Sequence, residues 1–278
     1  EGNAANASVS FARLGLDSGL VSNVGNDQYG RDIIASLHRS KVDTRYVHIN
    51  HGKASNHNYI LWYKDDRTVF TRHELYDYHW PQIHSDDLPK WLYFSSVSKN
   101  TLPFHDDLAD WLEEKPDVKL AFQPGTFQME EGAQRLKRIY KRCEVLLLNR
   151  QEAVTVGGGD SKNVHDLFDK LHALGPKVVI ITDGPRGAYA SSAEGRFFMP
   201  VYPDAAPPLE RTGAGDAFSS TIVAALIKGL PLEEALKWGP INSMNVVQHV
   251  GAQDGLLTES QLVSMLKGAP DWYHPNPM

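Results

Sequence analysis

Hydrophobic and polar residues follow two alternating periods along this chain. Short apolar runs of strand length stand between longer segments whose apolar positions have helical spacing. Four of the short runs are almost continuously apolar, which is typical of strands buried on both faces of a parallel sheet. These runs cover residues 90–97, 118–124, 144–149 and 177–184, and residues 19–25 form a further predicted strand.

Amphipathic segments fill the intervals between the predicted strands, and several end at a glycine, as helices commonly do. The predicted helices cover residues 6–15, 29–40, 105–115, 130–143, 164–175, 215–229, 232–250 and 258–268. Strands that alternate with helices in this way predict an α/β fold. We expect a doubly wound, mostly parallel sheet with helices on both faces.

Residues 45–80 interrupt the alternation. Within them, two short strand-like runs flank residues 64–67 with no crossover helix, which predicts a β-hairpin. We expect a small β excursion here and an α/β domain made of residues 1–44 and 81–278. The excursion is either a lid, because ligands of open α/β folds bind at the carboxyl ends of the strands, or a surface decoration.

The predicted lid is rich in aromatic residues. They are Tyr59, Trp62, Tyr63, Phe70, Tyr76, Tyr78 and Trp80. In an alternating hairpin, such residues pack onto a neighbouring element or a dimer partner more often than they stack on a ligand base. The histidines of this region, His51 and His57, lack the spaced partners of a zinc site, and we interpret them as surface or lid residues.

Composition excludes several classes of function. The 278 residues are 41% hydrophobic and 22% charged with a net charge of −6, so no strong positive field attracts nucleic acid. No apolar run approaches the roughly 18 residues of a membrane span. The single cysteine, Cys143, excludes an intrachain disulfide and indicates a cytoplasmic protein; its apolar neighbours predict a core position. Because the sequence opens without an initiating Met or a leading strand, we expect that an N-terminal segment is missing.

The stretch Gly213, Ala214, Gly215 and Asp216 places a carboxylate where a glycine-rich turn enters a predicted helix. The first backbone N–H groups of a helix have no intrahelical acceptor and carry partial positive charge, so this position favours an anion. A phosphoryl group in transfer is such an anion, and Asp216 beside it would act as a general base. Alternatively, Asp216 caps the helix and the glycines only form a tight turn.

A second polar pair ends the predicted strand 144–149. Asn149 and Glu152 lie in the first turn of the following segment, where both can face the carboxyl edge of the sheet. An amide and a carboxylate suit Mg²⁺, which keeps several waters and takes few protein oxygens. The alternative is a capping box, in which each side chain binds the other residue's backbone N–H.

A third turn follows the strand 177–184. Gly184 and Gly187 allow the backbone to approach a nucleotide closely, or they form a hairpin into the next strand. All three turns lie at the carboxyl ends of predicted strands, which meet at one edge of a parallel sheet. A single shared site is therefore favoured over three unrelated turns.

Together these segments resemble the ribokinase-like, or PfkB, carbohydrate kinase family over nearly the whole chain. Residues 2–33 are similar to the family's N-terminal signature, which implies that Gly2, Asn3 and Asn6 bind sugar hydroxyls. The resemblance also implies Mg²⁺ and phosphate contacts for Asn149 and Glu152, with Mg²⁺ bound through water. Gly213–Gly215 would form the anion hole and Asp216 would be the catalytic base.

On the nucleotide side, the resemblance implicates Thr182, Gly184 and Gly187, together with Asn242 and Gly251 from the segment that closes the pocket. The chain also departs from the family. It has Glu210 and Arg211 before the glycine turn, where an acidic residue commonly helps to bind a monovalent cation. Glu210 could replace that residue, whereas Arg211 argues against K⁺ dependence.

The implied activity is phosphorylation of a hydroxyl on a small sugar or sugar derivative, with ATP and Mg²⁺ and with K⁺ as a candidate. One alternative is a nucleoside kinase of the same fold. Another is a truncated, non-catalytic ligand-binding relative, because the family normally carries a substrate-gripping Asp on a strand before residue 2. By analogy we expect a homodimer formed through the lid.

Overall fold

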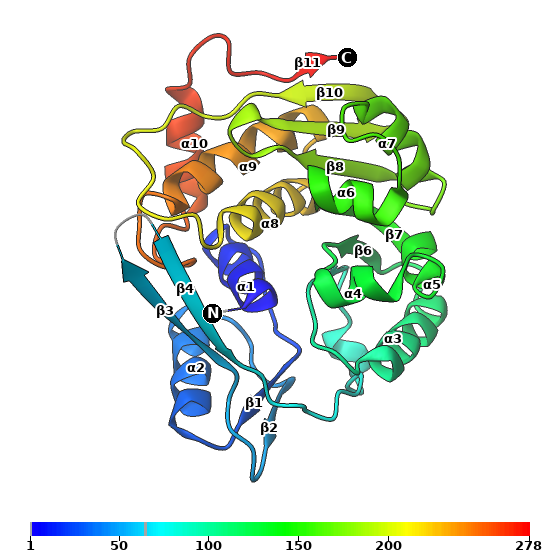
Figure 1. Cartoon of the computed structure of the whole chain (residues 1–278), viewed down its shortest axis with the longest axis vertical. Helices are drawn as coiled ribbons and strands as arrows, with labels where there is room; N and C mark the ends of the chain where they lie inside the picture. Colours follow the sequence, from blue (N-terminus) through cyan, green and yellow to red (C-terminus); the bar gives the residue numbers. More distant parts are fainter. Residues whose placement is uncertain (1, 64–65) are drawn as a thin grey trace.

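A central β-sheet organises the computed structural model, which describes residues 2–63 and 66–278 (Figure 1). Within the described residues its seven strands lie in the order β11-β10-β9-β8-β7-β6-β5. Strands β5 to β8 pair in parallel, and β8 to β11 pair antiparallel. The strands of this sheet are β5 (Trp91–Phe94), β6 (Lys119–Phe122), β7 (Cys143–Asn149), β8 (Val178–Thr182), β9 (Ala188–Ser192), β10 (Gly195–Met199) and β11 (Asn276–Pro277).

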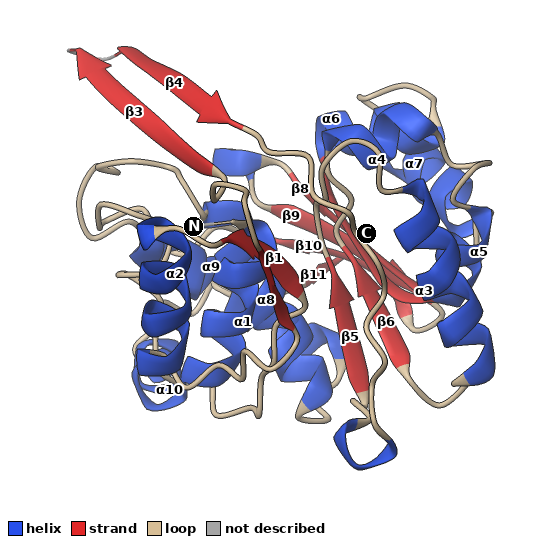
Figure 2. Cartoon of the chain, turned by 90° about the horizontal axis from the view of Figure 1, so that it is seen from below, coloured by secondary structure: helices blue, strands red, loops and turns tan. Residues whose placement is uncertain are grey.

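Helices cover both faces of this sheet, which confirms the doubly wound α/β prediction (Figure 2). One group is α1 (Asn3–Arg13), α8 (Ala214–Ile227), α9 (Leu232–Val246) and α10 (Glu259–Lys267). The other is α3 (Leu102–Glu114), α4 (Thr126–Glu131), α5 (Lys137–Arg142), α6 (Arg150–Gly157) and α7 (Val164–His172). Side chains alternate along a strand, so in β7 Val145 and Leu147 join the first core, whereas Leu146 and Leu148 join the second. Cys143 is buried in the second core, as its neighbours predict.

A separate two-stranded sheet lies beside α1. It pairs β1 (Ser22–Gly25) with β2 (Val47–Asn50) in parallel and packs with α2 (Gln28–Arg39). The predicted excursion 45–80 therefore includes β2, a strand that belongs to this small sheet. The hairpin itself is narrower: β3 (His57–Tyr63) pairs antiparallel with β4 (Asp66–Arg72) and projects from the body (Figure 2). That a strand precedes residue 2 stays a prediction.

One predicted helix is wrong as a single element. Residues 130–143 do not form a continuous helix, because Gly132 has φ +83° and ends α4, and α5 begins only at Lys137. A left-handed glycine after the last helical residue is a common helix stop. The short 3₁₀ segments η1 (Ser85–Asp87) and η2 (Gly184–Arg186) complete the described elements.

Asp27 fixes the segment that leads into the hairpin. Its carboxylate caps α2 by accepting the Gly30 N–H at 2.8 Å, and it also accepts the Ser55 N–H at 2.8 Å and the Ser55 hydroxyl at 2.6 Å. The Ser55 hydroxyl in turn accepts the Gly25 N–H at 2.9 Å. These hydrogen bonds, those from Ser55 foremost, lower the pKa of Asp27 to about 2.

We expect Asp27→Asn to lower the free energy of unfolding by about 1–2 kcal/mol, because a charged cap and its hydrogen bonds to Ser55 are weakened. The folded-state pKa lies below the unfolded value, so the contribution is complete above about pH 4 and disappears as the pH falls towards 2. Urea titrations at pH 7 and pH 3 measure this difference. Asp32→Asn, on the exposed side of the same helix, is the control; equal losses in both variants would contradict the prediction.

Candidate active site

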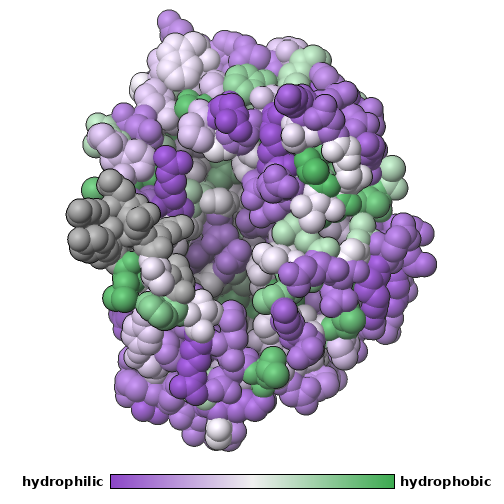
Figure 3. All heavy atoms as spheres, viewed as in Figure 1, coloured by the Kyte–Doolittle hydropathy of each residue, from purple (hydrophilic) through white to green (hydrophobic). Residues whose placement is uncertain are grey.

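A cavity of about 630 Å³ opens at the carboxyl ends of the strands. Figure 3 shows the hollow near the centre of the face seen in Figure 1. Its walls come from the start of α1, the start of β3, the ends of β7 and β8, and the first turn of α8. Nine residues predicted from the sequence line it: Gly2, Asn3, Asn6, Asn149, Glu152, Thr182, Gly213, Gly215 and Asp216.

The turn before α8 needs glycine at position 213. Gly213 has φ +80° and ψ −4°, a left-handed conformation that other residues rarely adopt. A Cβ there would lie 2.4 Å from Cβ of Ala252. Gly215 differs, since a Cβ built on it meets no atom within 4 Å, although the residue lines the cavity. The first N–H groups of α8 therefore stand at a turn whose backbone a ligand can approach closely.

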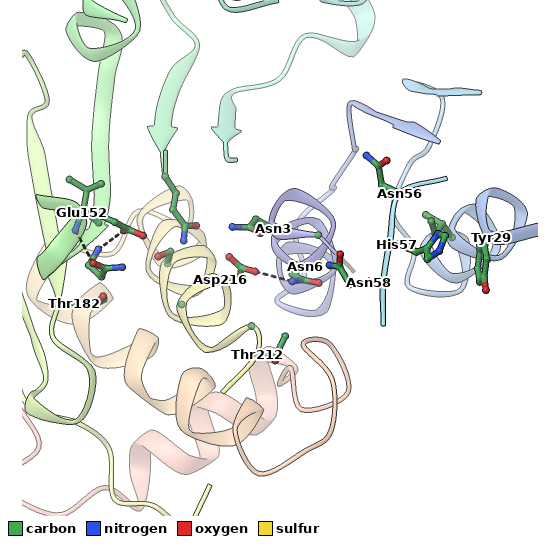
Figure 4. A pocket seen from close by; sticks show the side chains of 18 residues that line it. Asn3, Asn6, Tyr29, Asn56, His57, Asn58, Glu152, Thr182, Thr212 and Asp216 are labelled. Atoms are coloured by element: carbon green, nitrogen blue, oxygen red, sulfur yellow. Dashed lines mark hydrogen bonds between the residues drawn. The ribbon is translucent and has the colours of Figure 1, made fainter. Parts of the chain in front are cut away.

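Asp216 lies in the first turn of α8 and is buried, with 8% of its surface exposed. Its Oδ2 accepts a hydrogen bond from Nδ2 of Asn6 at 2.8 Å, which Figure 4 marks between the two helices. Nε2 of Gln253 donates to Oδ1 of Asn6 at 3.0 Å. Asn6 therefore holds the carboxylate from one side and is itself held from the other.

Opposing effects act on the pKa of Asp216. Burial raises it above the ordinary value, and hydrogen bonding from the Asn6 and Gln123 side chains lowers it; burial is the larger effect, so the net shift is upward. The Tyr93 hydroxyl donates to Oε1 of Gln123, which leaves the Gln123 amide N–H groups to face the carboxylate. Asp216 is thus a buried carboxylate that gains a proton more readily than an exposed one.

Asn149 and Glu152 form the predicted capping box at the start of α6. Oδ1 of Asn149 accepts the Glu152 N–H at 2.9 Å, and Oε2 of Glu152 accepts the Asn149 N–H at 2.7 Å (Figure 4). Burial, and secondly the charge of Asp216, raise the pKa of Glu152. Among the ion pairs of the described residues, none involves Glu152.

This donor set fits a hydrated Mg²⁺. Glu152 is a carboxylate in the cavity wall whose charge is not neutralised by a described cation, and Mg²⁺ prefers such oxygen ligands. In the described part of the chain, no group of three or more His, Cys, Asp or Glu residues could enclose a metal ion. The residues present therefore suit an ion that keeps its own waters and binds phosphates, rather than one held by protein ligands alone.

Of the three residues predicted at the nucleotide-side turn, one lines the cavity and two do not. Thr182, at the end of β8, lines the cavity, whereas Gly184 and Gly187 lie beyond its lining. Gly184 has φ +55° and open space where a Cβ would stand. Gly187 has φ +100°, and a Cβ at this position would lie 2.5 Å from the Met199 carbonyl oxygen, so close packing between strands requires this glycine. The turn does lead into an antiparallel strand, β9.

Asn242, predicted to contact the nucleotide, lies in the core instead. It is fully buried, donates to Oγ1 of Thr221 at 2.7 Å and accepts the Leu257 N–H at 2.9 Å. Its amide therefore serves the packing of α8, α9 and the loop after α9. Glu210 is also buried, and its Oε1 accepts the Gly251 N–H at 2.6 Å, which ties two loops together.

Several polar and aromatic residues of the cavity were not predicted to line it. They are Tyr29, Asn56, His57, Asn58 and Gln123. His57, interpreted from the sequence as a surface or lid residue, stacks on Tyr29 with ring centroids 4.9 Å apart. The only available signal was the spacing of Asn56 and Asn58, two residues apart at the start of a predicted hairpin strand.

Comparison with known proteins identifies the class. Residues 2–259 match the family model described as pfkB family carbohydrate kinase, and the chain belongs to this family. An ATP-dependent 6-phosphofructokinase of Thermoanaerobacterium thermosaccharolyticum is 28% identical over 264 residues, covering 90% of this chain and 80% of that protein.

Two solved structures share the fold. One is a putative ribokinase II of E. coli in complex with ATP and Mg²⁺, with a TM-score of 0.80 and 17% identity, covering 96% of this chain and 89% of that one. The other is a Methanocaldococcus jannaschii nucleoside kinase of the ribokinase family, with a TM-score of 0.79 and 20% identity, covering 96% and 87%. The chain is thus a carbohydrate kinase of the pfkB family.

We expect Gly213→Ala to destabilise the protein by more than about 1–2 kcal/mol, since a left-handed alanine is strained and its Cβ would collide with Ala252. Gly215→Ala is the matched control. It places a methyl group in open space within a helix and should leave the free energy of unfolding unchanged or slightly higher. Denaturant unfolding of both variants tests this; equal stability of the two would contradict it.

Proposed function

We propose that this kinase transfers a phosphoryl group from ATP to a hydroxyl of a small sugar or sugar derivative. Asp216 accepts the hydroxyl proton, and the backbone N–H groups of Gly213, Ala214 and Gly215 stabilise the transferring phosphoryl group. The observation that carries the proposal is the position of Asp216. This buried carboxylate stands one residue beyond a glycine turn at a helix start, and both line one cavity.

Asn149 and Glu152 would hold Mg²⁺ through water, and Thr182 with the Gly184–Gly187 turn would face the nucleotide. When bound, Mg²⁺ would neutralise charge on the phosphates. Glu152 supports this assignment. Burial and the neighbouring carboxylate of Asp216 disfavour its charged form, and a bound cation would compensate that charge. Gly251 would act indirectly, through its hydrogen bond to Glu210, and Glu210 is the candidate ligand for K⁺.

On the acceptor side, Gly2 and Asn3 would contact the substrate at the first turn of α1. Asn6 has a further role beyond the predicted substrate contact, because its amide holds Asp216 in place. The hairpin β3–β4 would close over the acceptor and exclude water, which competes as an acceptor.

Two alternatives remain distinct from this proposal. A nucleoside kinase is favoured by the structural likeness to the Methanocaldococcus nucleoside kinase, and phosphorylation of nucleosides without phosphorylation of sugars would select it. A non-catalytic relative would bind nucleotide without releasing ADP. An ADP-release screen of sugars, sugar derivatives and nucleosides, run with Mg²⁺ in both Na⁺ and K⁺ buffers, separates all three.

No helix in the described ranges 2–63 and 66–278 is long and apolar enough to cross a membrane. We propose that the enzyme works in the cytoplasm, as its free, buried Cys143 suggests. We also propose a homodimer through the hairpin. Tyr59, Leu61 and Phe70 lie on one face of the hairpin and are exposed, and such a face suits a partner surface.

We expect Asp216→Asn to lower kcat by at least about 1,000-fold with little change in ATP affinity, because Asn cannot accept the proton. Since burial raises the pKa of Asp216, kcat/KM of the unaltered enzyme should fall on the acid side at a pH above 3.8. Steady-state kinetics across pH and nucleotide titration measure both effects. Unchanged turnover would remove Asp216 from the base role.

The stability of the Asp216→Asn variant shows whether lost turnover reflects a lost base or a damaged fold. A carboxyl group whose folded-state pKa is raised costs stability once it ionises, so wild-type stability declines as pH rises from 3.8 through the folded-state pKa. At pH 7, Asp216→Asn should therefore raise the thermal midpoint, not lower it. A lower midpoint together with lost turnover would indicate general damage instead of a lost base.

For the dimer, we expect Leu61→Lys to convert the protein to a monomer in light scattering, because a charge in the middle of the contact face opposes association. Thr71→Lys adds the same charge on the other face of the hairpin. It should leave the mass of the dimer in light scattering unchanged. A monomeric wild-type protein would contradict the prediction.

A further inference from the structure

The acceptor half of the cavity lies between the start of α1 and the start of β3. Figure 4 shows α1, which carries Asn3 and Asn6, opposite the segment of Asn56, His57 and Asn58. Asn58 lies on the side of this segment that faces α1, and His57 lies on the other side, next to Tyr29. Gln123 also lines the cavity and interacts with Asp216. The polar groups that gather here are therefore mostly neutral side-chain amides.

Charge in the cavity has one sign. Among the described lining residues there is no lysine or arginine, and the acidic ones are Glu152 and Asp216. His57 is the only basic type, and its Nδ1 lies 3.0 Å from the Ser55 carbonyl oxygen. A carboxylate or phosphate ester on the acceptor would thus stand near Asp216, and near the ATP phosphates, without a full positive charge to pair with it.

In the acceptor half of the cavity, the first turn of α1 favours an anion. Its N–H groups carry the partial positive charge of a helix N-terminus, and Gly2 gives no side-chain cap. These donors bind a hydroxyl oxygen equally well. A hydroxyl group both donates and accepts, as an amide does, so several hydroxyls can be matched by amides without any charge being left unpaired.

We infer, building on the proposed function, that the acceptor is an uncharged polyhydroxy compound, such as a neutral sugar or polyol, and that the hairpin residues Asn56 and Asn58 select it. Asn6 has less capacity for this task, because its Nδ2 donates to Asp216 and its Oδ1 accepts from Gln253. Oδ1 of Asn56 accepts the Glu74 N–H at 2.6 Å, which leaves its NH₂ group to donate. Asn58 is exposed within the lining and is available on both ends.

The first experiment measures turnover and binding in parallel on the full chain with Mg²⁺. Acceptors are neutral sugars and polyols, the matching sugar acids and sugar phosphates, and nucleosides. Turnover is followed by ADP release, and binding by thermal shift in the presence of a non-hydrolysable ATP analogue. We expect kcat/KM for the best neutral acceptor to exceed that for its acid or phosphate by at least about 100-fold.

The two readouts separate failure of this inference from failure of the proposed function. An acid, a phosphate ester or a nucleoside that turns over or binds as well as the best neutral compound overturns the inference while leaving a kinase. Binding of neutral polyols without any ADP release would overturn the proposed function and support the inferred ligand class. Binding of no neutral compound overturns the inference.

A charge-introducing variant tests the role of the hairpin. Asn58→Lys should improve kcat/KM for a sugar acid or sugar phosphate at least about 10-fold relative to the neutral acceptor. Thr71→Lys is the control, because Thr71 is the register partner of Asn58 on β4 but does not line the cavity. If both variants shift the selectivity equally, or if Asn58→Lys leaves it unchanged, the assigned role of Asn58 is wrong.

Discussion

The buried hydrogen bond between Asn6 and Asp216 fixes the relation between the two helices on which the site depends. A second contact, from the Ser220 hydroxyl to the Ser10 hydroxyl at 2.8 Å, lies one turn further along both helices. Both pairs are separated by 210 positions in the sequence, so α1 and α8 run in the same direction in one register. Ser10 and Ser220 are fully buried, and their small side chains let the helices approach closely. The acceptor-side helix and the carboxylate are thereby held as one unit.

The loop after α9 adds a second constraint to the same unit. Ala252 packs against Gly213, Gln253 donates to Asn6, and the Gly251 N–H binds Glu210. Three successive residues of one loop therefore contact the glycine turn, the amide that holds Asp216, and the segment just before that turn. A shift of this loop would move the glycine turn and the Asp216 carboxylate together, which keeps their relative position constant. Such support from beyond the reacting groups is what a site needs when its geometry must be held within fractions of an ångström.

Much of the fold followed from the sequence because local pattern and tertiary environment agree. The apolar runs 144–149 and 177–184 are central strands, and the pattern of 215–229 is α8. The single helix predicted for 130–143 was wrong because one glycine conformation outweighed the periodicity. Residues of the cavity lining were predicted where a sequence motif contains them, as at Asp216. Gln123, Asn56 and Asn58 were not predicted, because only the packing of the hairpin and β6 around the cavity brings these isolated amides together.

Asn149 and Glu152 show why a structural and a functional interpretation of one motif need not compete. The capping box uses Oδ1 of Asn149 and Oε2 of Glu152, so each side chain keeps a polar atom that the cap does not occupy. The cap also fixes the rotamers of both residues at the edge of the cavity, which reduces the entropy lost when a ligand binds. Burial and the nearby Asp216 raise the pKa of Glu152, and a bound cation would favour the charged form of this carboxylate. The capping interaction is therefore compatible with the Mg²⁺ role proposed for the carboxylate, and its presence is no argument against that role.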